Sequence, residues 1–164
     1  MRRHRPKLER PKKRWDKARI EEEKKLMEKY GLRRKRELWK AQSVLRNFRR
    51  RARELLANPD EKLINELLGK LYRLGLLEKD ASLEDVLKLN VEDVLERRLQ
   101  TVVFKKGLAK TLKQARQFIV HGHIAIDGRR FPFPGALVRR EWEDKIGYYF
   151  KSPVAKNPPA GEQE

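Results

Sequence analysis

The stretch TVVFKKGLAKTLKQARQFIVHGHIAIDGRRF, which runs from Thr101 to Phe131, carries the clearest folding signals in the chain. Thr111 followed three residues later by Gln114 is a capping box, whose side chains satisfy free N–H groups at the start of a helix. Gly122 is placed to end that helix, because glycine adopts a left-handed backbone conformation without strain. The pattern predicts a helix with a buried face of Leu112, Ala115, Phe118 and Ile119.

Strand signals follow this helix, and a second helix precedes it. Residues 124–126 predict a strand, and Asp127-Gly128 is typical of a two-residue hairpin turn. Residues 136–138 and 146–150 predict further strands. The preceding helix is expected to end near Lys106-Gly107 and to bury Val91, Val94, Leu95, Leu99 and Val102. Residues 91–150 are therefore expected to form two helices packed on a small antiparallel sheet.

The region before residue 91 reads as helical throughout. Asp16 can cap a helix over residues 17–30 that ends at Gly31. Residues 61–77 predict a leucine-rich helix whose buried side is Leu63, Leu67, Leu71 and Leu74. Capping boxes at Ser82 with Asp85 and at Asn90 with Asp93 start two more helices. Between them lies the best specified helix, with an apolar stripe of Leu38, Ala41, Leu45, Phe48, Ala52 and Leu55. The predicted fold class is α+β, a mainly helical N-terminal region followed by the C-terminal helix-and-sheet module.

The charge of the chain is strongly positive and unevenly distributed. The 42 Lys and Arg against 24 Asp and Glu give a formal net charge of +18. Residues 1–56 carry +15, residues 57–96 carry −5 and residues 97–164 carry +8. Such an excess attracts nucleic acid or anionic lipid. Two basic regions flanking an acidic middle indicate a partner that is large or folded.

Composition also excludes several classes of protein. The chain has no Cys, which excludes disulfides and thiolate zinc sites. No apolar run approaches the roughly 20 residues that a membrane span needs, and the first residues lack the apolar stretch of a secretory signal. We therefore expect a cytoplasmic protein.

Two groups of arginines are candidate phosphate ligands. Arg46, Arg49, Arg50 and Arg53 fall on one flank of the predicted helix over residues 38–55, where few acidic residues are close in sequence to neutralise them. In the next helix, Arg98 points into the apolar stripe and is expected to be held by a carboxylate or by backbone oxygens. Arg97 lies outside that stripe and is the better candidate for an external anion.

The strings LERRLQTVVFKKGLAKTLKQARQFIVHGHIAIDGRR (95–130) and YGLRRKRELWKAQ (30–42) resemble the small-subunit ribosomal protein S4 family, in its archaeal and eukaryotic branch. The resemblance covers about residues 10–150. It implies binding of small-subunit rRNA at a multi-helix junction early in assembly, and a position near the channel through which messenger RNA enters. Neighbouring small-subunit proteins and messenger RNA are the other implied partners. The segments are then a basic extended arm (1–15), a helical rRNA-binding region (16–90), the S4-type module (91–150) and an irregular tail (151–164).

The resemblance also assigns residues in the module. Some bacterial relatives hold zinc through N-terminal cysteines; because this chain has none, no metal or other cofactor is expected. Asp127 stands where the family often has Asn. The positions that match the RNA-facing side of the family's module are Arg97, Lys105, Lys106, Lys110, Lys113, Arg116, His121, His123 and Arg129.

Other interpretations of the same residues are weaker. Residues 107–111 lack the glycine spacing of a phosphate-binding loop, and His121 with His123 lacks further metal ligands. The module also occurs attached to RNA-modifying enzymes, but residues 57–96 are too few for a catalytic domain. The charge alone equally permits a DNA-binding architectural protein. Trp15, Trp39 and Trp142 can each pack in a core or stack on a base, and packing is favoured.

Overall fold

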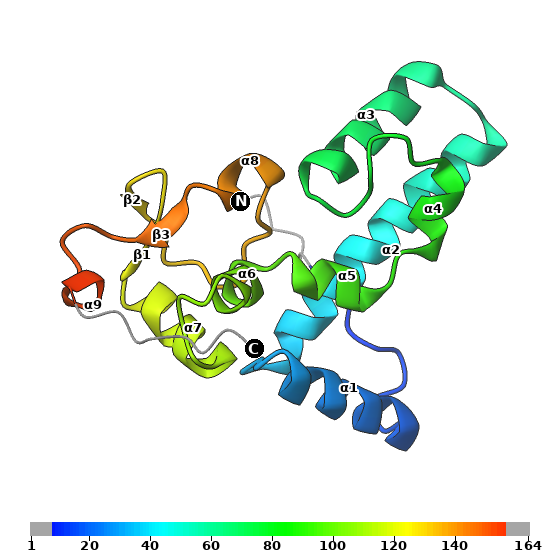
Figure 1. The fold of residues 1–164 in the computed structure, drawn as a ribbon. Helices are drawn as coiled ribbons and strands as arrows, with labels where there is room; N and C mark the ends of the chain where they lie inside the picture. Colours follow the sequence, from blue (N-terminus) through cyan, green and yellow to red (C-terminus); the bar gives the residue numbers. More distant parts are fainter. Residues whose placement is uncertain (1–7, 157–164) are drawn as a thin grey trace, which may run out of the picture.

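The computed structural model describes residues 8–156, so residues 1–7 of the expected arm and residues 157–164 of the expected tail lie outside the described part. Figure 1 shows two lobes that meet near α5 and α6. The helical lobe contains α1 (Lys17–Lys29), α2 (Lys35–Ala57), α3 (Glu61–Arg73), α4 (Leu83–Lys88) and α5 (Val91–Glu96). The C-terminal lobe contains α6 (Leu99–Lys105), α7 (Leu112–Val120), β1 (Ile124–Ile126), β2 (Arg129–Arg130), α8 (Arg140–Glu143), β3 (Ile146–Tyr148) and α9 (Pro153–Lys156).

Each lobe has its own hydrophobic core. All six residues of the predicted stripe on α2 are buried, and they pack with leucines of α3 and with Val94 and Leu95 of α5. The second core joins α6 and α7 to the sheet, around Leu99, Ile119 and Ile124. The α+β fold class is confirmed. Within residues 8–156, none of the helices combines the length and apolar character needed to cross a bilayer.

The predicted helix starts in the helical lobe are confirmed. The Asp16 side chain accepts a hydrogen bond from the N–H of Arg19, and Gly31 follows α1 with a φ of +57°. Both capping boxes, at Ser82 and at Asn90, form as expected. These motifs form because each needs only hydrogen bonds between residues two or three positions apart.

The leucine-rich helix is shorter than predicted. α3 ends at Arg73 rather than near residue 77, because Gly75 adopts a φ of +68° and its N–H bonds to the Tyr72 carbonyl oxygen at 2.8 Å. This is the glycine-dependent helix ending expected of a Schellman-type turn. Of the predicted buried leucines, Leu67 and Leu71 are buried, whereas Leu63 near the start of α3 is 49% exposed.

Substituting Gly75 by Ala is expected to lower the free energy of unfolding by about 1–2 kcal/mol, the cost of a left-handed conformation for an L-residue. An added Cβ would also lie 2.5 Å from Cζ of Arg97 and displace it. The control is Gly69→Ala inside α3, where a Cβ meets no atom within 4 Å. The free energy of unfolding of that variant, measured in urea, should rise by about 0.5–1 kcal/mol, because alanine is the better helix former. Equal effects from both variants would contradict this account.

The single helix predicted across residues 91–106 is wrong. The chain leaves the helix at Arg97 and Arg98 and starts α6 at Leu99. The carbonyl of Arg97 accepts from the N–H of Val138 at 2.8 Å, and the N–H of Leu99 donates to the Ala136 carbonyl at 2.8 Å. These hydrogen bonds to a distant segment replace the helical ones at this point of the chain. The predicted strand at residues 136–138 takes part only in one antiparallel bridge, between Arg98 and Leu137.

The C-terminal lobe contains the expected antiparallel sheet, although the strand predicted over residues 146–150 ends at Tyr148. β1 pairs antiparallel with β2 and with β3 in the order β2-β1-β3. Asp127 and Gly128 both have positive φ, at 54° and 75°, as a two-residue hairpin turn of this kind requires. The tail was expected to be irregular, but residues 153–156 form the single turn α9, and the Ser152 side chain before it is buried.

Candidate nucleic-acid interface

A half-buried carboxylate on α2 holds the two lobes together. Glu37 accepts hydrogen bonds from Arg98 at 2.6 Å and from both terminal nitrogens of Arg116 at 2.9 Å. Gln100 adds bonds from its amide nitrogen to the carbonyls of Gly31 and Leu112. Burial by itself would raise the pKa of Glu37, but the hydrogen bonds from the two guanidinium groups outweigh it and hold the pKa below its usual range. We call Glu37, Arg98 and Arg116 the inter-lobe ion cluster.

The prediction that Arg98 has a structural role is confirmed, since the residue is 5% exposed and its side chain pairs with Glu37. The interpretation of Arg97 as a group directed outward is wrong. Its Nε donates to the Leu74 carbonyl at 2.8 Å, one terminal nitrogen donates to the Val138 carbonyl at 3.1 Å, and the other pairs with Glu143. Because the helix breaks at this point, the geometry assumed for Arg97 does not hold. It forms a second connection between the lobes.

Several other predicted module residues also have partners in the protein. Arg116 belongs to the inter-lobe ion cluster. Lys105 pairs with Glu96, and Lys106 donates to the Glu143 carbonyl. The Lys105–Glu96 ion pair lies near the surface, where such pairs contribute little. Nδ1 of His123 lies 2.9 Å from the Ser152 hydroxyl oxygen.

The remaining predicted module residues are exposed. Lys110 and Lys113 lie at the start of α7 beside the end of α6, and together with Lys105 and Lys106 they form what we call the module surface. His121 and Arg129 lie beyond the other end of α7. The nine residues of α7 separate the two groups by about 13 Å. The four lysines therefore fall between residues 105 and 113, around the connection from α6 to α7, whereas His121 and Arg129 lie beyond the far end of α7.

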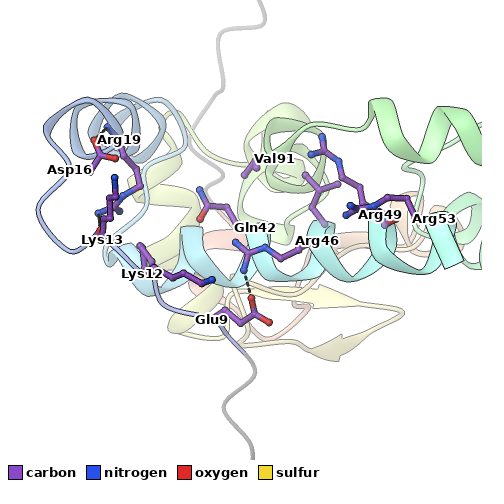
Figure 2. Close-up of a pocket in the computed structure, with 12 residues that line it drawn as sticks. Glu9, Lys12, Lys13, Asp16, Arg19, Gln42, Arg46, Arg49, Arg53 and Val91 are labelled. Carbon is purple, nitrogen blue, oxygen red and sulfur yellow. Dashed lines mark hydrogen bonds and ion pairs between the residues drawn. The ribbon is translucent and has the colours of Figure 1, made fainter.

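A cationic groove lies between the N-terminal segment and α2 (Figure 2). It has a volume of about 530 Å³. Arg46, Arg49 and Arg53 line it from α2, whereas Arg50 is not part of the lining and lies 3.8 Å from Glu54. The opposite wall comes from residues before and within α1. The basic residues of this arm groove are Lys12, Lys13, Arg19, Arg46, Arg49 and Arg53.

The sequence has few acidic residues near the arginines of α2, but folding brings one close to them. Glu9, which is far from α2 in sequence, pairs with Arg46, as the dashed line in Figure 2 shows. Arg49 donates to the Leu89 carbonyl, so its charge is partly used within the fold. Lys12, Lys13 and Arg19 were not selected from the sequence. For Lys12 and Lys13 the reason is that the run PKKR carries no periodicity that would indicate the direction of its side chains. Six cations against Glu9 and Asp16 leave the groove positive and suited to a phosphate backbone.

Comparison with known protein families identifies the class of protein to which this fold belongs. Residues 97–131 match the S4 domain, so the C-terminal lobe makes the chain an S4-domain protein. Proteins named small ribosomal subunit protein uS4 match almost the whole chain. The identity is 52% with the protein of Methanothermobacter thermautotrophicus, covering 94% of this chain and 92% of that one. It is 58% with the protein of Ignicoccus hospitalis, covering 87% of each. The chain belongs to the small ribosomal subunit protein uS4 family.

Family membership also excludes one of the alternative functions considered from the sequence. The uS4 family is a family of ribosomal proteins and not of enzymes, so this chain is not the accessory module of an RNA-modifying enzyme. The relatives with this similarity include that of Saccharolobus solfataricus, at 50% identity over 98% of this chain and 91% of its own. These relatives come from archaea, in agreement with the branch inferred from the sequence.

Proposed function

We propose that this protein is a structural constituent of the small ribosomal subunit in the cytoplasm and a primary binder of its rRNA. In this proposal it stabilises a multi-helix junction during assembly and lies near the channel through which messenger RNA enters. Its other partners would be neighbouring small-subunit proteins and messenger RNA. The observation that carries the proposal is the pair of basic surfaces, the arm groove and the module surface, on two lobes that are fastened together.

Rigid spacing between these surfaces supports recognition of RNA shape. The major groove of an RNA helix is too deep and narrow for side chains to read, so a folded RNA is recognised through the arrangement of its backbones. Two cationic surfaces in a fixed relative orientation favour the arrangement of RNA helices that reaches both. Binding would thereby shift the junction toward a conformation that free RNA populates only partly.

The test is binding of the full chain to an archaeal small-subunit rRNA transcript, combined with chemical footprinting. We expect protection on several helices around one junction, and an affinity that falls at least about tenfold between 50 and 200 mM salt as counterions are released. Duplex DNA at matched salt is the competitor, because a DNA-binding architectural protein would prefer it. Preference for the duplex, or protection confined to one single-stranded loop, would contradict the proposal.

A further inference from the structure

Trp15 is the most exposed large apolar side chain in the described part of the chain, at 93% of its full exposure. The expectation that it packs in a core is wrong. Trp15 immediately precedes the helix cap Asp16, where an apolar side chain can pack on the fourth helical residue, here Ile20. Such a contact would bury the indole, and the indole is not buried. Folding therefore supplies no reason for a tryptophan at this position.

The surroundings of Trp15 are cationic. With Trp39 and Ile20 it lines a groove of about 750 Å³, which we call the Trp15 groove. Arg19, which also lines this groove, pairs with Glu23, but among residues 8–156 no ion pair involves the other four arginines that line it. These arginines are Arg10, Arg14, Arg34 and Arg36. A flat, exposed aromatic ring among unpaired cations is complementary to a nucleotide, which has an aromatic base and an anionic phosphate.

A buried carboxylate supports one wall of this groove. Glu23 is 1% exposed, accepts the indole N–H of Trp39 at 3.0 Å, and pairs with Arg19 and Lys35. Burial would raise the pKa of Glu23, but these three donors lower it, so the carboxylate stays charged and holds all three side chains. The wall is preorganised, whereas Trp15 in front of it has no contact that buries it.

The Trp15 groove also adjoins the arm groove. Pro11 and Arg19 line both, so the segment before α1 has cationic surface on each side. An RNA strand bound in the arm groove would therefore lie next to the positive residues around Trp15. This continuity favours RNA over a lipid surface, because a lipid surface would have no reason to follow both grooves.

We propose that Trp15 is a stacking site for one unpaired base of the bound RNA, with Arg10, Arg14 and Arg34 holding the adjacent phosphates. The inference rests on the proposed function and adds to it a single-stranded contact outside the module surface. Every base has an aromatic face, so stacking here accepts any base. The site anchors a nucleotide splayed out from the junction.

The test compares Trp15→Ala and Trp15→Phe with the unmodified chain for binding to an archaeal small-subunit rRNA transcript. Loss of a stacked base should weaken binding about 5- to 150-fold in Trp15→Ala and much less in Trp15→Phe. The slope of log affinity against log salt should stay the same, because the indole carries no charge. RNA should also quench tryptophan fluorescence in the unmodified chain more strongly than in Trp15→Phe.

The control is Leu56→Ala, which removes another exposed apolar side chain, on α2 outside both grooves, and should bind like the unmodified chain. Unfolding in urea should be unchanged in both alanine variants. If the unmodified chain binds tightly and Trp15→Ala binds equally well, the stacking site is refuted while the proposed function stands. Failure of the unmodified chain to bind would refute both. Binding to phosphatidylserine vesicles that depends on Trp15, with RNA binding that does not, would assign the groove to lipid.

Discussion

Replacing Glu37 by Ala is expected to lower the free energy of unfolding by about 3–5 kcal/mol, a large fraction of the 5–15 kcal/mol typical of a folded domain. The reason is the inter-lobe ion cluster. Arg98 is almost fully buried, and without Glu37 its charge would have no carboxylate partner. Urea unfolding measures the loss.

Two controls separate this effect from a generic loss of an ion pair. Glu78 pairs with Arg140 of α8 at 2.9 Å, also between the lobes, but it is highly exposed. Glu78→Ala should therefore lower the free energy of unfolding by less than about 1 kcal/mol. The double variant Glu37→Leu, Arg98→Leu should recover much of the lost stability, because it removes the unpaired buried charge. A loss at Glu37 no larger than that at Glu78 would show that the cluster does not hold the lobes together.

The same carboxylate gives stability a pH dependence. Its pKa is lowered in the folded protein, so the stabilisation is fully present above the pKa of the unfolded chain, about 4.5, and is lost as the pH falls through the folded value. The pKa of Glu23 is also lowered in the folded protein, so its stabilisation is lost over the same pH range. Glu37→Gln should flatten the fall in unfolding free energy below pH 4.5.

Neutralising the arm groove is expected to have the largest effect on RNA binding. The triple variant Lys12→Gln, Lys13→Gln, Arg46→Gln removes three exposed cations that Figure 2 shows around the groove. Charge-assisted contacts contribute about 1.5 kcal/mol or more each, and 1.4 kcal/mol is a factor of ten. We expect an affinity loss of at least about 100-fold for the small-subunit rRNA transcript. The slope of log affinity against log salt should also fall by about 2 to 3.

A matched triple variant distinguishes local contacts from net charge. Lys24→Gln, Lys62→Gln, Lys79→Gln removes the same charge from exposed positions outside the groove. It should bind with nearly unchanged affinity and salt dependence. Equal losses in the two triple variants would mean that overall charge, and not the arm groove, determines binding.

The predictions that the structure confirms depend on neighbours in the chain. The capping boxes at Ser82 and Asn90 and the turn at Asp127 need hydrogen bonds within a few residues, so the sequence contains both partners. The apolar stripe of α2 is equally local, because helical periodicity alone decides which residues share a face.

The failed predictions share a different cause. The break at Arg97 requires backbone bonds to residues 136–138. Leu63 was placed in a core by its spacing, but the way α3 meets α2 leaves it exposed. Trp15 has no local pattern that predicts exposure. Each outcome depends on packing between distant segments.

By itself, the sequence determined the fold class, the family and the two basic regions, because helix periodicity, caps, turns and charge are properties of short stretches. Only the tertiary structure decided which cations have partners within the protein and which lie together at one groove. It placed Arg97, Arg98 and Arg116 in contacts between the lobes, and it gathered Lys12, Lys13 and Arg46 around one groove. The physical reason is that a charge is neutralised by whatever lies within a few ångströms of it, and that distance is set by folding rather than by order along the chain.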